Sequence, residues 1–346
     1  MTRRDGQGSC QTDLALFVNR SLEVHRMPLP AFGIICARIA LLAAVLLPLA
    51  AIGMPQETRY TTVELISENA SVPVTGGTIT VGLYLEPNPS WHAYWSNPGD
   101  AGKAPRITWS LPPGFDAGEF SFPSPVLLPF GDLTTYGYDE PILLLAEITV
   151  PEGLVAGETV EIGGKARWVV CDDSICVPDR ANVSLQLAAG DGNLNPDQAA
   201  RFDEARRKLP DPGAWPAGFS IADGEVSFDI APADIRHDFD DAYLFVESTN
   251  LVHYGRQSVE VSASGLRFVM DAAAADGLDD ATSAVLTYTR SDGQAASIAL
   301  EFLQRPAATL SEALATGPES AMGLLRAIVF AAVGGIILNL MPCVFP

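Results

Sequence analysis

Two cysteines stand in the stretch "RWVVCDDSICVPDR", residues 167–180, where their spacing could support redox, structural or metal chemistry. Cys171 and Cys176 are separated by four residues and follow an apolar run. A disulfide requires Cα atoms about 5.5 Å apart, whereas five fully extended steps span roughly 17 Å. Residues 172–175 must therefore turn back, as in a four-residue hairpin loop, if the pair is to close.

Three chemistries compete for this pair. A closed zinc site normally takes four ligands, and outside the N-terminal leader only His92, His237 and His253 could complete it, at unrelated spacings. A structural disulfide is the stronger alternative, but the chain-entropy model gives only about 2 kcal/mol for so short a loop. A chain of this length can form hydrophobic cores and does not need a structural disulfide for its stability. The pattern favours a redox-active pair and predicts neither a metal nor a bound cofactor.

The flanking carboxylates are part of the predicted site. Asp172 and Asp173 directly follow Cys171. Negatively charged neighbours disfavour a thiolate. We therefore expect the pair to be unreactive in the free protein and to react when a bound partner changes the environment of the cysteines. Alternatively, the two Asp residues only fill a solvated turn.

The two ends of the chain indicate export and membrane attachment. Residues 39–49 form a short apolar core after Arg38, and small residues follow it, as is typical of a signal peptide. The predicted leader is residues 1–53, and Met27 is the alternative start of the chain. Residues 327–346 contain no charged residue and have the length of a membrane helix. The chain ends inside this span, so we expect a fragment of a longer membrane protein.

Charge and cysteine usage narrow the function further. The net charge is −21, and because the leader is basic, the rest of the chain is still more acidic. Such a body repels phosphates, which argues against nucleic-acid binding. Cys10 and Cys36 would leave with the leader, and Cys343 lies in the membrane span. Cys171 and Cys176 then have no competitor for pairing in an oxidising compartment.

The elements that would position the pair are predicted to be strands. Short alternating apolar runs, many turns and 26 prolines indicate a mainly β chain of tandem immunoglobulin-like sandwiches, followed by a truncated transmembrane helix. In the connector, Asn195 is the expected helix cap and Pro210 the stop. The stretch "NPSWHAYWSNPGDAGKAP" is expected to be a loop whose aromatic residues serve packing; His92 and Asp100 within it could transfer protons. The predicted divisions are 1–53 leader, 55–190 redox sandwich, 191–218 helical connector, 219–303 second sandwich, 304–321 linker and 322–346 membrane helix.

Three motifs together resemble a known family. "WHAYWSNPGDAGKAP" (91–105), "WVVCDDSICVP" (168–178) and "NLMPCVFP" (339–346) are similar to hallmarks of the DsbD thiol:disulfide interchange proteins, and the long ectodomain resembles their ScsB branch. The resemblance implies a protein-disulfide reductase in which Cys176 attacks an acceptor's disulfide and Cys171 resolves the mixed disulfide. Cys343 matches the first membrane cysteine, whose partner lies beyond residue 346. Four residues separate the cysteines here, one fewer than in the short form of the family.

The resemblance also implies partners, a location and a cap. Electrons would come from the membrane domain and a C-terminal thioredoxin-like domain of the full-length protein, and would pass to periplasmic thioredoxin-like or disulfide isomerase acceptors, including those of cytochrome c biogenesis. The chain would lie in the bacterial inner membrane, with residues 55–321 in the periplasm. An aromatic loop caps the dithiol in the family; the matching candidates are Phe130, Tyr136 and Tyr138, although Thr135 stands where a phenylalanine is usual. The alternative function is a non-enzymatic exported binding or chaperone module with a structural disulfide; a third is a metal-binding resistance protein.

Overall fold

The computed structural model describes residues 55–232, 238–263, 265–273 and 280–305, which belong to one compact unit. The predicted leader, nearly all of the predicted linker and the predicted membrane helix lie outside the described residues, and so do Cys10, Cys36 and Cys343. Within the described ranges, no helix is long and apolar enough to span a bilayer.

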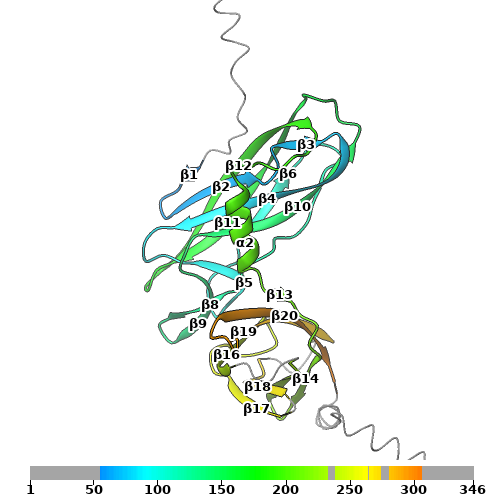
Figure 1. The fold of residues 1–346 in the computed structure, drawn as a ribbon. Coiled ribbons are helices and arrows are strands. Elements are labelled where there is room, and N and C mark those ends of the chain that lie inside the picture. Colours follow the sequence, from blue (N-terminus) through cyan, green and yellow to red (C-terminus); the bar gives the residue numbers. More distant parts are fainter. Residues whose placement is uncertain (1–54, 233–237, 264, 274–279, 306–346) are drawn as a thin grey trace, which may run out of the picture. The chain divides into compact units, whose positions relative to one another are not determined.

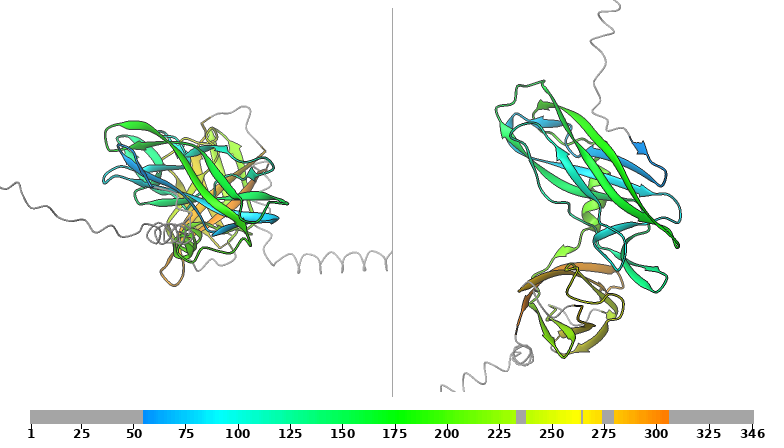
Figure 2. Two further views of the ribbon diagram at one scale, coloured as in Figure 1. Left: turned by 90° about the horizontal axis from the view of Figure 1, so that it is seen from above. Right: turned by 180° about the vertical axis from the view of Figure 1, so that it is seen from behind.

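Two sheets form most of the first block, which contains the cysteines (Figure 1). One sheet has the order β1-β2-β4-β10-β7 and comprises β1 (Gln56–Glu57), β2 (Thr61–Ser67), β4 (Thr75–Pro87), β10 (Ile142–Glu152) and β7 (Asp116–Ala117). The other has the order β3-β12-β11-β6 and comprises β3 (Ser71–Pro73), β12 (Cys176–Gly190), β11 (Thr159–Cys171) and β6 (Arg106–Ser110). The view from behind shows the long strands β4, β10, β11 and β12 running the length of this block (Figure 2).

Alternation along the strands builds the core between these two sheets. Val81, Leu83 and Leu85 of β4 are fully buried, and they share one hydrophobic cluster with Ile162 and Trp168 of β11. Side chains alternate between the faces of a strand, so the intervening residues of β11 face outward. The mainly β prediction is confirmed, and the first block has the two facing sheets of a sandwich.

A third, smaller sheet comprises β5 (Ala93–Gly99), β9 (Leu133–Tyr138) and β8 (Val126–Phe130). The expectation that residues 93–99 lie in a loop was wrong. Tyr94 and Trp95 are residues that favour strands, and Ala93 and Tyr94 pair with Tyr138 and Gly137 of β9. The prolines and glycines that suggested a loop come mostly at the end of this segment.

One helix covers the outer face of the first sheet. α2 (Ala199–Lys208) buries Phe202 and Ala205 against Ile66, Leu143 and Leu145. The helix ends at Lys208, with Leu209 as its C-cap just before Pro210, as predicted. The cap was predicted wrongly: the N-cap is Gln198, without a side-chain bond, because Asn195 instead closes a preceding turn by accepting the N–H of Asp197.

The second block is a single sheet in the order β16-β19-β20-β14-β15-β18-β17, with β13 (Asp211–Pro212) paired to β20. Its strands are β14 (Ala217–Ala222), β15 (Glu225–Ile230), β16 (Asp238–Val246), β17 (Ser258–Ser262), β18 (Gly265–Asp271), β19 (Ala281–Thr289) and β20 (Ala295–Gln304). Hydrogen bonds join all of them in one sheet around its own core, which includes Phe219, Phe228 and Phe302. The predicted tandem of immunoglobulin-like sandwiches is therefore not confirmed.

Candidate functional site

The two cysteines form a disulfide across the end of a hairpin. Cys171 is the last residue of β11 and Cys176 the first of β12, and the two are directly opposite in the register. Their Sγ atoms are bonded and their Cα atoms lie 4.1 Å apart. The four-residue loop that the spacing required is present, because β11 and β12 are antiparallel.

Asp172 holds this loop in shape. Its Oδ1 accepts the N–H groups of Ser174 and Ile175, both at 2.8 Å, and its own N–H donates to the Ile175 carbonyl. The N–H donors of Ile175 and Ser174 stabilise the carboxylate and lower the pKa of Asp172. Asp173 is exposed in the same loop. The carboxylate of Asp172 thus has a structural role in the turn, while a role of either Asp in tuning the thiols stays a prediction.

The two sulfur-bearing residues differ in burial. Cys171 is 0% exposed and packs in a small cluster with Tyr94 and Val169. Cys176 is exposed. A molecule approaching from solvent therefore meets Cys176 first.

Tyr94 of β5 is the aromatic residue next to the disulfide. Its hydroxyl lies 3.9 Å from Sγ of Cys176. A disulfide sulfur carries no hydrogen, so the hydroxyl is the donor. Burial raises the pKa of Tyr94 to about 12, which keeps this hydroxyl protonated at neutral pH. Gly102 makes the ring's position possible, because a Cβ at that residue would lie 2.5 Å from the ring.

His92 is brought beside Cys171 by the backbone. The two residues exchange both main-chain hydrogen bonds, at 2.9 and 3.2 Å, as an isolated antiparallel bridge. Burial lowers the pKa of His92, although the carboxylates of Asp173, Asp139 and Asp172 act in the opposite direction. Of the two residues considered for proton transfer, His92 has its backbone beside Cys171, whereas Asp100 accepts the N–H of Thr134. A role of either residue in proton transfer stays a prediction.

The three predicted cap residues lie on the β8–β9 hairpin. Tyr136 is 1% exposed, and its hydroxyl lies 3.1 Å from that of Tyr243 in an aromatic cluster that also holds Phe245. Tyr138 is buried and donates to the Pro123 carbonyl. Phe130 ends β8 and is partly buried. Their role as a cap stays a prediction.

Sequence reasoning missed the position of Tyr94. Its motif, "WHAYWSNPGD", was assigned to packing. That assignment holds for Trp95 in the core and for Trp91, whose ring is tilted against that of Tyr60 with the centroids 4.2 Å apart. No sequence signal distinguishes Tyr94, because its place beside the disulfide depends on the pairing of His92, two residues earlier, with Cys171.

Comparison with known proteins gives a family match and a solved structure of similar fold. Residues 62–188 match the family model described as thiol:disulfide interchange protein DsbD, N-terminal. The crystal structure of the N-terminal periplasmic domain of ScsB from Proteus mirabilis is similar in fold, with a TM-score of 0.55 and 20% identity over 74% of this chain and 98% of that one. The YadV chaperone aligns with a TM-score of 0.19 and 10% identity over 68% of this chain and 98% of its own, too weakly to carry an argument. No curated protein matches the sequence.

Proposed function

Because residues 62–188 form a domain of the DsbD N-terminal family, we propose that this chain carries electrons by dithiol–disulfide exchange at Cys171 and Cys176. In its reduced form the pair would reduce a disulfide in an acceptor protein. The full-length protein would then be a protein-disulfide reductase, and no bound cofactor takes part in this step.

The observation that carries the proposal is the unequal burial of the two sulfur-bearing residues. The Cys176 thiolate attacks one sulfur of the acceptor, whose disulfide breaks, and a Cys176–acceptor disulfide forms. The Cys171 thiolate then attacks Sγ of Cys176, which releases the acceptor as a dithiol and restores the Cys171–Cys176 bond. Two electrons pass to the acceptor. This order needs an accessible Cys176 and a sheltered Cys171, and Cys171 is 0% exposed.

The proposed setting is the periplasmic side of a bacterial inner membrane. Residues 55–321 would follow a cleaved signal peptide and precede the membrane domain, in which Cys343 would receive electrons. A C-terminal thioredoxin-like domain would reduce the Cys171–Cys176 pair, and a thioredoxin-like protein or a disulfide isomerase would oxidise it. The ScsB structure, described as a periplasmic domain, supports this location by its fold alone.

The test is the reduction potential of the pair in a chain whose Cys10, Cys36 and Cys343 are replaced by serine. Equilibration with glutathione or dithiothreitol should give a reversible value of roughly −200 to −270 mV, the range of thioredoxins and glutaredoxins. A value well below about −300 mV, without exchange, would identify a structural disulfide. The chain would then be a binding or chaperone module and the proposal would be wrong.

A further inference from the structure

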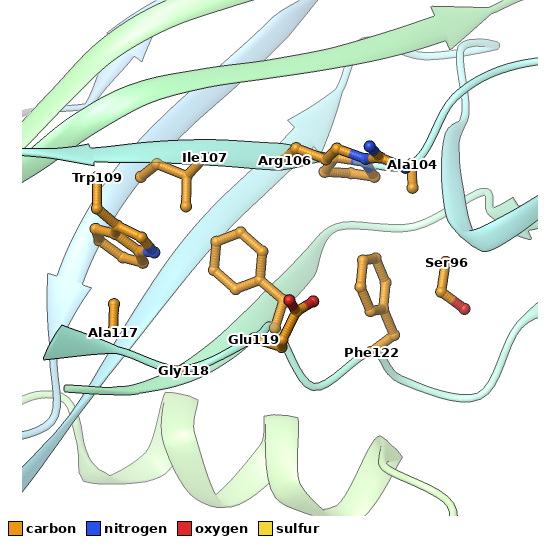
Figure 3. Close-up of a pocket in the computed structure, with 11 residues that line it drawn as sticks. Ser96, Ala104, Arg106, Ile107, Trp109, Ala117, Gly118, Glu119 and Phe122 are labelled. Atoms are coloured by element: carbon orange, nitrogen blue, oxygen red, sulfur yellow. The ribbon is translucent and has the colours of Figure 1, made fainter. Parts of the chain in front are cut away.

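A groove of 1080 Å³ lies beside the β11–β12 hairpin and is rich in cations. Its lining includes five basic side chains, contributed by the β5–β6 connection and by strands β6, β11 and β12: Lys103, Arg106, Lys165, Arg167 and Arg180. All five are exposed. A neighbouring hollow of 480 Å³ shares Arg106 with the groove and also holds one carboxylate, Glu119 (Figure 3). Ser96 and Ala104 lie at its Arg106 end, and Trp109 and Ala117 lie at its other end.

This concentration of positive charge is exceptional for the chain. Residues 55–190 contain six Lys or Arg against seventeen Asp or Glu, and five of those six cations line this groove. The one carboxylate in the lining, Asp179, accepts a hydrogen bond from the Thr58 hydroxyl. Among the residues that the structure describes, none forms an ion pair with the five cations, although Arg201, Arg206 and Arg267 elsewhere all do.

Three of the cations are adjacent on neighbouring strands. Arg167 of β11 is directly opposite Arg106 of β6 on one side and Arg180 of β12 on the other. Like charges directly opposite each other destabilise a sheet. An arrangement with this cost and no neutralising partner in the described chain is suited to an anionic ligand.

Arg106, Arg167 and Arg180 form a row across the three strands, and this arginine row lies on the same sheet face as the disulfide. Along β11, the outward positions from Arg167 are Val169 and then Cys171, and each is opposite an outward position of β12. The pairs follow in the order Arg167 with Arg180, Val169 with Pro178, and Cys171 with Cys176. At about 3.3 Å per residue, four residues place the row roughly 13 Å from the disulfide. A protein bound at Cys176 would reach it.

We propose that this groove binds an acidic segment of the protein that exchanges its disulfide at Cys176. The inference rests on the proposed function and names a chemical property of the acceptor. The arginines, whose guanidinium groups bind carboxylates through two parallel hydrogen bonds, orient the acceptor so that its disulfide meets Sγ of Cys176.

The binding test uses the oxidised full chain in a nonionic detergent and a short fluorescein-labelled polyglutamate peptide, with fluorescence anisotropy as the readout. The variant is Arg106→Gln, Arg167→Gln, Arg180→Gln. Its matched control, Arg59→Gln, Arg207→Gln, Arg256→Gln, removes the same charge from exposed cations outside the groove. We expect binding that weakens with salt and falls by about tenfold or more in the groove variant only. Removing like charges should leave its melting temperature unchanged or raised, which excludes unfolding as the cause.

Two results would overturn the inference. If peptide binding weakens equally in the two triple variants, the peptide is attracted by the overall charge and not by the groove. If the groove binds phosphatidylglycerol vesicles but not the peptide, the partner is a membrane.

A kinetic experiment separates the inference from the proposed function. The reduced chain should reduce a disulfide peptide flanked by glutamates faster than one flanked by glutamines, and the groove variant should lose only this preference. Reduction of both peptides at one rate contradicts the inference alone, whereas reduction of neither contradicts the proposed function.

Discussion

Cys171 and Cys176 share one covalent bond but differ in their access to solvent. Cys171 is sheltered against Tyr94 and Val169, which limits the access of solvent and of an incoming disulfide to its sulfur. Cys176 is exposed at the start of β12, and the Tyr94 hydroxyl lies 3.9 Å from its sulfur. The two cysteines therefore differ in their accessibility to a reacting partner.

This asymmetry predicts opposite behaviour of two single variants, made in the background without Cys10, Cys36 and Cys343. Cys171→Ser leaves an accessible thiol, so oxidised glutathione should convert it rapidly to a stable mixed disulfide. Cys176→Ser leaves the buried thiol, and its adduct should form at least about tenfold more slowly, because glutathione must reach a residue that is 0% exposed. Mass spectrometry without reductant measures both rates. Similar rates would remove the basis for assigning Cys176 as the attacking residue.

At the scale of elements, the β5–β6 connection fixes the aromatic neighbour of the disulfide. Gly102 adopts φ +95°, a conformation that other residues rarely accept, and a Cβ there would lie 2.5 Å from the Tyr94 ring. Gly153 has a similar φ of +89° but open space around it. The two glycines therefore separate the cost of backbone conformation from the cost of the contact with Tyr94.

Gly102→Ala should lower the free energy of unfolding by about 1 to 3 kcal/mol more than Gly153→Ala, because only the former forces a ring to move. Equilibrium unfolding in urea measures the difference. The displaced ring should also change the reaction rate of the reduced pair with oxidised glutathione in Gly102→Ala and leave it unchanged in Gly153→Ala. Equal stability of the two variants would show that Tyr94 adapts without cost.

Elements with a clear period were predictable from the sequence, whereas the contacts between elements were not. Alternation along residues 79–85, other apolar runs and the cysteine spacing led to the predicted strands and the hairpin loop. The hairpin of β14 and β15 was overlooked, although Asp223-Gly224, both with positive φ, is a standard turn signal. The positions of Tyr94 and His92 beside the disulfide depend on pairing between residues far apart in the chain, and no local pattern encodes such pairing.

At the scale of the whole molecule, buried tyrosines link stability to alkaline pH. The tyrosines whose pKa burial raises above the ordinary value include Tyr94, Tyr136, Tyr138, Tyr243 and Tyr254. In the unfolded chain these hydroxyls lose their protons near pH 10, while the folded chain retains them. The folded state then binds more protons than the unfolded state, so stability falls as pH rises.

We expect the free energy of unfolding to be unaffected by these groups below about pH 10 and to fall above it by up to about 1.4 kcal/mol per pH unit for each tyrosine. For Tyr94 the fall should extend to about pH 12. Denaturant unfolding at a series of alkaline pH values measures the slope, and Tyr136→Phe should make it shallower. A free energy of unfolding that stays constant well above pH 10 would show that the tyrosine pKa values do not differ between the folded and unfolded chains.

The register of the β11–β12 hairpin has a kinetic consequence. Main-chain hydrogen bonds hold the Cys171 backbone opposite that of Cys176 whether or not the sulfurs are bonded, because the strands pair along their whole length. During an exchange, the second thiol is thus present at a high effective molarity beside the bond it must break. Release of an acceptor becomes a unimolecular event that needs no refolding and no external thiol. Mixed disulfides between the wild-type chain and an acceptor should therefore be short-lived. The turnover rate of the domain would then be limited by the rate at which acceptors bind.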